Sequence, residues 1–241
     1  MPPKKGAKNV GKAIITAAPV KEPTGDGTVI VLPFSSMAHM AAGLARVSAY
    51  LEDPEYEGRP ISLFEIGDLN IPAKRYAGHN FPLQTYDQTI GLLGTLSNAE
   101  KIVQRAITEV AKKVKDRKNA YVVAYVDGDL KTLEHEKQHA TFYFCPDYQQ
   151  RVAGIWKSVE SGWSSWAKEF HVHLGKMYCE RVWLDEFQAI VLNREYECAT
   201  KVVQLLQSVV PKIEQLPYHL VTVKLPEIPL EQAEENKDAQ A

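Results

Sequence analysis

The sequence predicts a mostly helical α+β domain with a small β-sheet. Most of the chain has apolar residues at helical spacing, while only a few short runs are rich in β-branched and aromatic residues. The chain has 241 residues, of which 45% are hydrophobic and 24% charged, as in ordinary globular proteins. A chain of this length can bury one sizeable core, so we expect one domain.

The first half of the chain begins with a short β-rich run at Thr28–Pro33, and Ser36–Leu51 follows with the spacing of an amphipathic helix. The segment Pro72–Pro82 is interpreted as a loop because Gly78 and Pro82 interrupt it. A second amphipathic helix is expected to begin after Asn98, a good N-cap residue.

The second half contains the best predicted strand, Tyr121–Val126. Asp129 can cap a helix that runs from Leu130 to about Phe144, where Pro146 ends it. The remaining expected elements are helices at Tyr148–Val159, Trp163–Tyr178, Val182–Leu192 and Glu195–Val209, and a strand at His219–Leu225.

The two ends of the chain are interpreted as disordered tails. Residues 1–27 carry several lysines among Pro, Gly and Ala, and residues 226–241 are mostly acidic. The domain is therefore expected to span residues 28–225.

Composition argues against two classes of partner, nucleic acid and membrane. The net charge of −2 gives no reason to expect nucleic acid, and no apolar run is long enough to cross a membrane. The odd, widely spaced cysteines Cys145, Cys179 and Cys198 argue against a disulfide framework. We expect an intracellular, cytoplasmic protein.

The most informative motif is HExxH, at His135-Glu136-Lys137-Gln138-His139 on the helix that Asp129 caps. Positions i and i+4 of a helix share a face, so His135 and His139 can bind one metal ion. Glu136 can reach a water on that ion and act as a general base. The pattern therefore predicts a zinc site equipped for hydrolysis.

A third ligand is expected from Val182–Leu192, where Asp185 and Glu186 interrupt an otherwise apolar helix. A buried carboxylate needs a cation or hydrogen-bond donors, and zinc supplies that compensation. We assign Glu186 as the third ligand and expect Asp185 to accept the outer N–H of a ligating histidine. The alternative is that both acids pair with Arg181 or Arg194, or face solvent.

Other histidines offer weaker alternatives. His171 and His173 are rival third ligands, but two residues apart on a helix they point in different directions, so at most one can face the site. His39, His79 and His219 are interpreted as structural. Glu136 and His139 also fit the ExxH unit of di-iron bundles, but the chain has no second copy.

These motifs resemble the gluzincin class of zinc metallopeptidases, and within it a poorly characterised bacterial and phage group. The resemblance rests on Thr132–Phe144 and Asp185–Ala189, with weaker similarity at Tyr50–Ile61 and Leu69–Pro72. It implies a zincin-like fold with His135, His139 and Glu186 as ligands and Glu136 as catalytic base.

The expected function is a zinc-dependent hydrolase, most simply a metallopeptidase with a peptide or protein substrate. Tyr178, His171 and His173 are candidate oxyanion donors, and Tyr121–Val126 is a candidate strand for β-augmentation by substrate. An amidase acting on non-peptide bonds fits equally. Lys137, at a usually uncharged position, motivates the alternative of an inactive zincin-like scaffold or interaction protein.

Overall fold

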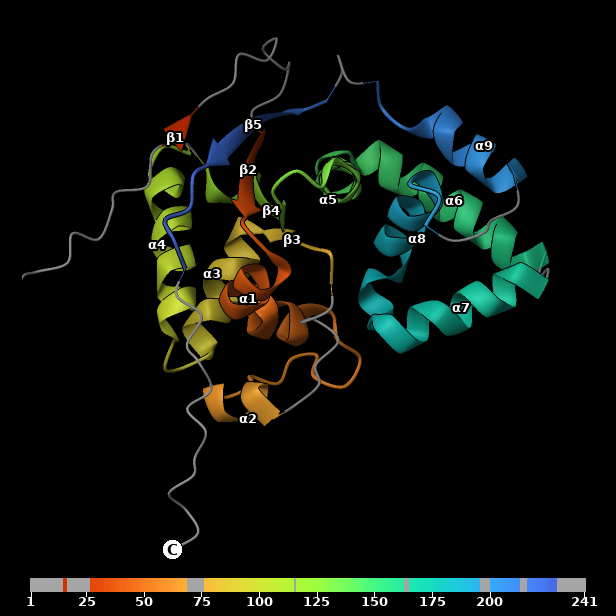
Figure 1. Cartoon of the computed structure of the whole chain (residues 1–241). Helices are drawn as coiled ribbons and strands as arrows, with labels where there is room; N and C mark the ends of the chain where they lie inside the picture. Colours follow the sequence, from red (N-terminus) through yellow and green to blue (C-terminus); the bar gives the residue numbers. More distant parts are fainter. Residues whose placement is uncertain are drawn as a thin grey trace, which may run out of the picture.

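The structure is a computed structural model that describes residues 15–16, 27–68, 76–114, 116–162, 165–195, 200–212 and 216–228. In it a mixed sheet lies between two layers of helices (Figure 1). The strand order is β1-β5-β2-β4-β3. Strand β2 runs parallel to both β4 and β5, while β1 and β3 pair antiparallel at the two edges. The strands are β1 (Ile15–Thr16), β2 (Gly27–Phe34), β3 (Gly78–Pro82), β4 (Ala120–Val126) and β5 (Tyr218–Val223).

Strand β2 is buried on both faces because helices cover the sheet on either side. Successive side chains of a strand point to opposite faces. Ile30 and Leu32 therefore pack in one hydrophobic cluster, and Val29 and Val31 in another. The near-continuous apolar run of this strand follows from that double burial.

One face of the sheet is covered by α1 (Met37–Glu52), α3 (Leu83–Leu92) and α4 (Asn98–Ala111). A buried ion pair joins α1 to α4: Arg46 Nε and Glu100 Oε1 lie 2.7 Å apart. Glu100 also completes a capping box with Ser97, so the N-cap of α4 is Ser97 and the expected Asn98 is wrong. The short α2 (Leu63–Asp68) follows α1.

The other face is covered by α5 (Leu130–Phe144), whose Ala140 packs against the strands. Beyond α5 the last helices form a cluster of their own, centred on buried residues such as Phe170 and Phe187. These helices are α6 (Pro146–Gly162), α7 (Ser165–Met177), α8 (Trp183–Leu192) and α9 (Thr200–Val209). The predicted α+β class, mostly helical with a small sheet, is confirmed.

Two sequence-based interpretations are wrong. The expected loop at Pro72–Pro82 ends in strand β3, because Gly78–Pro82 pairs with β4 despite its Gly and Pro. Strand β4 lies between β2 and β3, so its backbone is already paired and β-augmentation at Tyr121–Val126 is excluded. The helix expected from Glu195 is described only over Thr200–Val209.

Most of the predicted tails lie outside the described residues. Ile15–Thr16 pairs with β5, and Gly27 begins β2. Ile228 is 5% exposed and belongs to the main hydrophobic cluster, so packed chain continues past residue 225. Within the described ranges, no helix is both long and apolar enough to cross a bilayer.

Candidate metal centre

The two histidines of the HExxH motif lie side by side on α5, as their spacing predicts. Asp129 begins this helix by accepting the backbone N–H of Thr132 at 3.1 Å, which confirms the expected cap. The Nε2 atoms of His135 and His139 are 3.0 Å apart. Both imidazoles are largely buried, His139 almost completely.

Helix α8 brings Glu186 to the same point. Its Oε1 lies 3.7 Å from His139 Nε2, and one ligand atom from each of the three residues lies within 4.8 Å of the others. In a tetrahedral zinc site with bonds of about 2.0–2.1 Å, two ligand atoms stand about 3.3 Å apart. The distance of 3.0 Å between the two Nε2 atoms is a little shorter than this value, and the 3.7 Å from His139 Nε2 to Glu186 Oε1 is a little longer. The His-His-Glu group can therefore hold a metal ion.

Each histidine is oriented from behind by a carboxylate. His139 Nδ1 lies 2.9 Å from Asp185 Oδ1, the carboxylate expected from the sequence, although the angle of this pair lies outside hydrogen-bond geometry. His135 Nδ1 lies 2.9 Å from Glu195 Oε1, a residue that the sequence analysis missed. A carboxylate at Nδ1 keeps the proton on that nitrogen and leaves Nε2 free to bind a metal.

Glu195 reaches His135 because the chain turns sharply after α8. Arg194 has a φ of 54°, the left-handed conformation that closes many helices. The Glu195 N–H then donates to the Ile190 carbonyl at 3.1 Å. Glycine is the usual residue at such a position, and its absence removed the sequence signal for this turn.

The donor set suits a cation. The two Nε2 atoms, 3.0 Å apart, form a hydrogen bond when one of them carries a proton; if both protons sit on Nδ1 instead, two lone pairs face each other, and a positive charge between them removes the repulsion. Glu186 Oε2 is also buried without a hydrogen-bond partner. Burial raises the pKa of Glu186 to about 7. A divalent ion would satisfy all three groups at once.

Glu136 is held apart from the ligand set. Its Oε2 accepts a hydrogen bond from Asn80 Nδ2 at 2.9 Å, and Asn80 Oδ1 accepts one from the Tyr121 hydroxyl at 2.5 Å. Burial raises the pKa of Glu136. The carboxyl group packs directly over Gly78, where any Cβ would collide with it. Glu136 is thus fixed beside the histidines without pairing to either.

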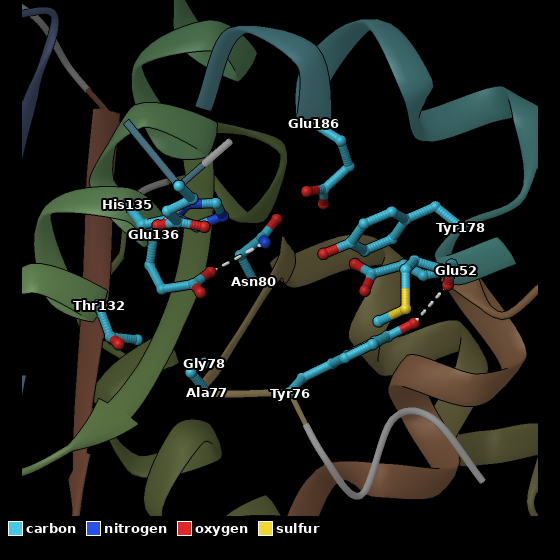
Figure 2. Close-up of a pocket in the computed structure, with 12 residues that line it drawn as sticks. Glu52, Tyr76, Ala77, Gly78, Asn80, Thr132, His135, Glu136, Tyr178 and Glu186 are labelled. Atoms are coloured by element: carbon cyan, nitrogen blue, oxygen red, sulfur yellow. Dashed lines mark hydrogen bonds and ion pairs between the residues drawn. The ribbon is translucent and has the colours of Figure 1, made fainter. Parts of the chain in front are cut away.

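A pocket of about 180 Å³ opens in front of these groups (Figure 2). Besides the site residues, its wall contains Glu52, Tyr76 and Tyr178. A neighbouring pocket of about 260 Å³ shares Glu52, Asn80 and Glu186 with it. The site therefore has room for part of a substrate on two sides.

The alternative interpretation, in which Asp185 and Glu186 pair with arginine or face solvent, does not match the structure. Arg181 pairs with Glu57 at 2.8 Å, while Asp185 and Glu186 both face His139. Lys137 pairs with Glu134 at 2.7 Å on the solvent side of α5. The charge at this unusual position therefore does not enter the pocket.

The remaining histidines lie elsewhere. His171 packs against Trp156 and Trp183, and His173 against Phe170, so neither is a third ligand or an oxyanion donor. Tyr178 is the one member of the expected donor trio that lines the pocket. The histidines interpreted as structural contact serine or threonine hydroxyls: His39 with Ser35 and Ser36, His79 with Ser48, and His219 with Thr28.

Comparisons with protein families, with curated proteins and with solved structures found no match to this chain.

Proposed function

We propose that this protein is a zinc-dependent hydrolase that cleaves peptide bonds. The observation that carries the proposal is the position of Glu136: a buried carboxylate beside two candidate ligands, lining the pocket and held by Asn80. A purely structural zinc site is closed by four protein ligands, whereas catalytic sites have three and an open position. Among the described residues only His135, His139 and Glu186 converge.

The residues divide the work of hydrolysis among them. When bound, zinc supplies a Lewis acid that polarises the substrate carbonyl and lowers the pKa of a water to about 7. Glu136 takes the proton from the attacking water and delivers it to the leaving amine. Asn80 orients the Glu136 carboxylate during both transfers. Asp185 and Glu195 keep the two imidazoles in the ligating tautomer.

Tyr178 is the proposed donor to the developing oxyanion. Burial beside Glu186 raises the pKa of its phenol well above the usual value, so the hydroxyl keeps its proton. The hydroxyl points into the pocket between Glu186 and Glu52 (Figure 2). A hydrogen bond of this kind is worth about 10²–10³ in kcat when directed at the transition state.

Two measurements test the proposal. Metal analysis of pure protein should give one zinc per chain, lost in the double variant His135→Ala/His139→Ala and kept in His39→Ala/His219→Ala. Cleavage of a peptide library should be abolished by Glu136→Gln, which keeps the metal, and unaffected by Glu134→Gln on the exposed side of the same helix. A wild-type protein without zinc would refute the proposal.

The same experiment decides between the proposed hydrolase and the alternatives. Adding ester and non-peptide amide substrates to the library identifies an amidase. Zinc binding with no hydrolysis that depends on Glu136 would instead establish a zincin-like scaffold. Lys137 pairs with Glu134 away from the pocket, so its charge is no argument for this alternative, which rests on the oxyanion donor still being a proposal.

A further inference from the structure

Glu52, the last residue of α1, places a carboxyl group in the pocket. The proposed hydrolysis does not use this carboxyl group. Glu52 is 7% exposed and lines both pockets. Among the described residues its side chain makes neither a hydrogen bond nor a salt bridge. In Figure 2 it points into the cavity next to the Tyr178 hydroxyl. We propose that Glu52 binds the positively charged group of a substrate residue next to the scissile bond, an inference that rests on the proposed hydrolase function.

The contact that Glu52 makes with the rest of the fold uses its backbone and not its side chain. The Glu52 carbonyl accepts the Cys179 N–H at 2.6 Å, which ties the end of α1 to the segment before α8. The carboxyl group contributes nothing to this contact. A buried carboxylate without a partner destabilises the fold, and the described residues offer the Glu52 carboxyl group none.

Every other acid in the pocket wall has at least one carboxyl oxygen facing a side chain of the site, although Glu186 Oε2 has no hydrogen-bond partner. Glu136 accepts from Asn80, Glu195 faces His135, and Glu186 faces His139. The described lining residues of the 180 Å³ pocket include neither lysine nor arginine, and Arg181, which lines the neighbouring pocket, pairs with Glu57. A divalent ion at the histidines offsets only part of this negative charge. We therefore infer that the ligand completing the pocket carries a positive charge, and that Glu52, which has no partner in the described part of the chain, meets it.

The aromatic wall around Glu52 suits the same ligand. The rings of Tyr76 and Tyr178 stack with centroids 5.6 Å apart, and the Tyr76 hydroxyl donates to the Met177 carbonyl at 2.7 Å. Fixed aromatic faces attract ammonium and guanidinium groups. An aromatic wall with one buried carboxylate discriminates against uncharged groups, because only a cation compensates the carboxylate.

The positive charge has two possible sources in a peptide: the free α-ammonium of an N-terminal residue, or the side chain of lysine or arginine. Three hydroxamates separate them, since each binds zinc through the same group. Alanine hydroxamate carries an α-ammonium, Nα-acetyl-lysine hydroxamate carries a side-chain ammonium, and Nα-acetyl-alanine hydroxamate carries no charge. Their dissociation constants are measured calorimetrically with the zinc-loaded full-length protein.

The wild type is expected to bind one of the two cationic probes at least tenfold more tightly than the neutral probe. The variant Glu52→Gln should lose that preference while keeping its affinity for the neutral probe. The matched control Glu55→Gln, an exposed acid three residues away, should keep the preference. Because Gln replaces a buried ionisable group with a neutral group of the same size, Glu52→Gln should melt no lower than the wild type.

Three results would overturn the inference. Equal affinities of the zinc-loaded wild type for all three probes would refute it and leave the proposed hydrolase intact. A preference retained in Glu52→Gln would assign the recognition to another group. Two zinc ions per wild-type chain and one in Glu52→Gln would make Glu52 a ligand of a second metal. A wild type without zinc would instead refute the proposed function on which the inference rests.

Discussion

The close packing of Gly78 against Glu136 gives the sharpest test of the catalytic assignment. A Cβ at position 78 would lie 2.7 Å from Glu136 Cδ, whereas ordinary van der Waals contact begins at 3.4 Å. The Gly78→Ala variant must therefore displace the carboxyl group by at least about 0.7 Å. The side chain of Glu136 is flexible enough to move, so the fold should survive and the hydrogen bond from Asn80 should break.

A displacement near 1 Å in a catalytic group lowers the rate by about 10²-fold. We therefore expect Gly78→Ala to keep one zinc per chain, to melt within a few degrees of the wild type, and to lose about two orders of magnitude in kcat/KM. Metal analysis, calorimetry and peptide cleavage measure the three quantities. Gly91→Ala is the control, because a Cβ there meets nothing within 4 Å. Full activity in Gly78→Ala, or loss of its zinc, would refute the assigned position of Glu136.

Three further predictions concern the surroundings of the site. Asp185→Asn and Glu195→Gln should each weaken zinc binding about 10–100-fold in a chelator competition, because each frees an imidazole Nδ1; unchanged affinity in both would contradict the role of these carboxylates. Burial lowers the pKa of His79 to about 3 from 6.5, so the unfolded chain takes up a proton that the folded chain does not. As pH falls from 6.5 to 3, the His79 contribution should therefore lower the free energy of unfolding by about 1.4 kcal/mol per pH unit. Urea titrations of His79→Gln should show a shallower pH dependence of stability than the wild type, and an identical dependence would refute the lowered pKa of His79. Arg46→Met leaves the buried Glu100 carboxylate without its cation, although the Ser97 N–H still donates to it, and should lower the free energy of unfolding by about 3–5 kcal/mol; a loss below about 1 kcal/mol in urea denaturation would contradict the importance of this pair.

Local patterns in the sequence were sufficient for the parts of the site that depend on one helix. The i, i+4 spacing placed His135 and His139 on one face, and Asp129 marked the start of their helix. Two acids in an apolar helix identified Glu186, because burial leaves a carboxylate few alternatives to a cation. The contact of Asp185 with His139 followed from the same reasoning.

The residues that were missed depend on distant parts of the chain. Asn80 lies on β3, which forms by pairing with β4. Gly78 and Pro82 are typical of loops, so the sequence of this segment did not indicate a strand. Glu195 depends on a left-handed Arg194, which no sequence pattern marks. Glu52 resembles any polar residue at the end of a helix until the fold closes the pocket over it.

The three candidate ligands come from two adjoining layers: His135 and His139 from the helix on the sheet, and Glu186 from the cluster of α6 to α9, against which Phe142 of α5 also packs. An ion bound there fastens one layer to the other, so its removal should loosen more than the pocket. With a chelator present, backbone amides in α8 are expected to exchange with deuterated solvent faster than those in β2 and β4, because the sheet keeps its own core. The exchange rate of the α8 amides would then report metal occupancy directly, without any substrate.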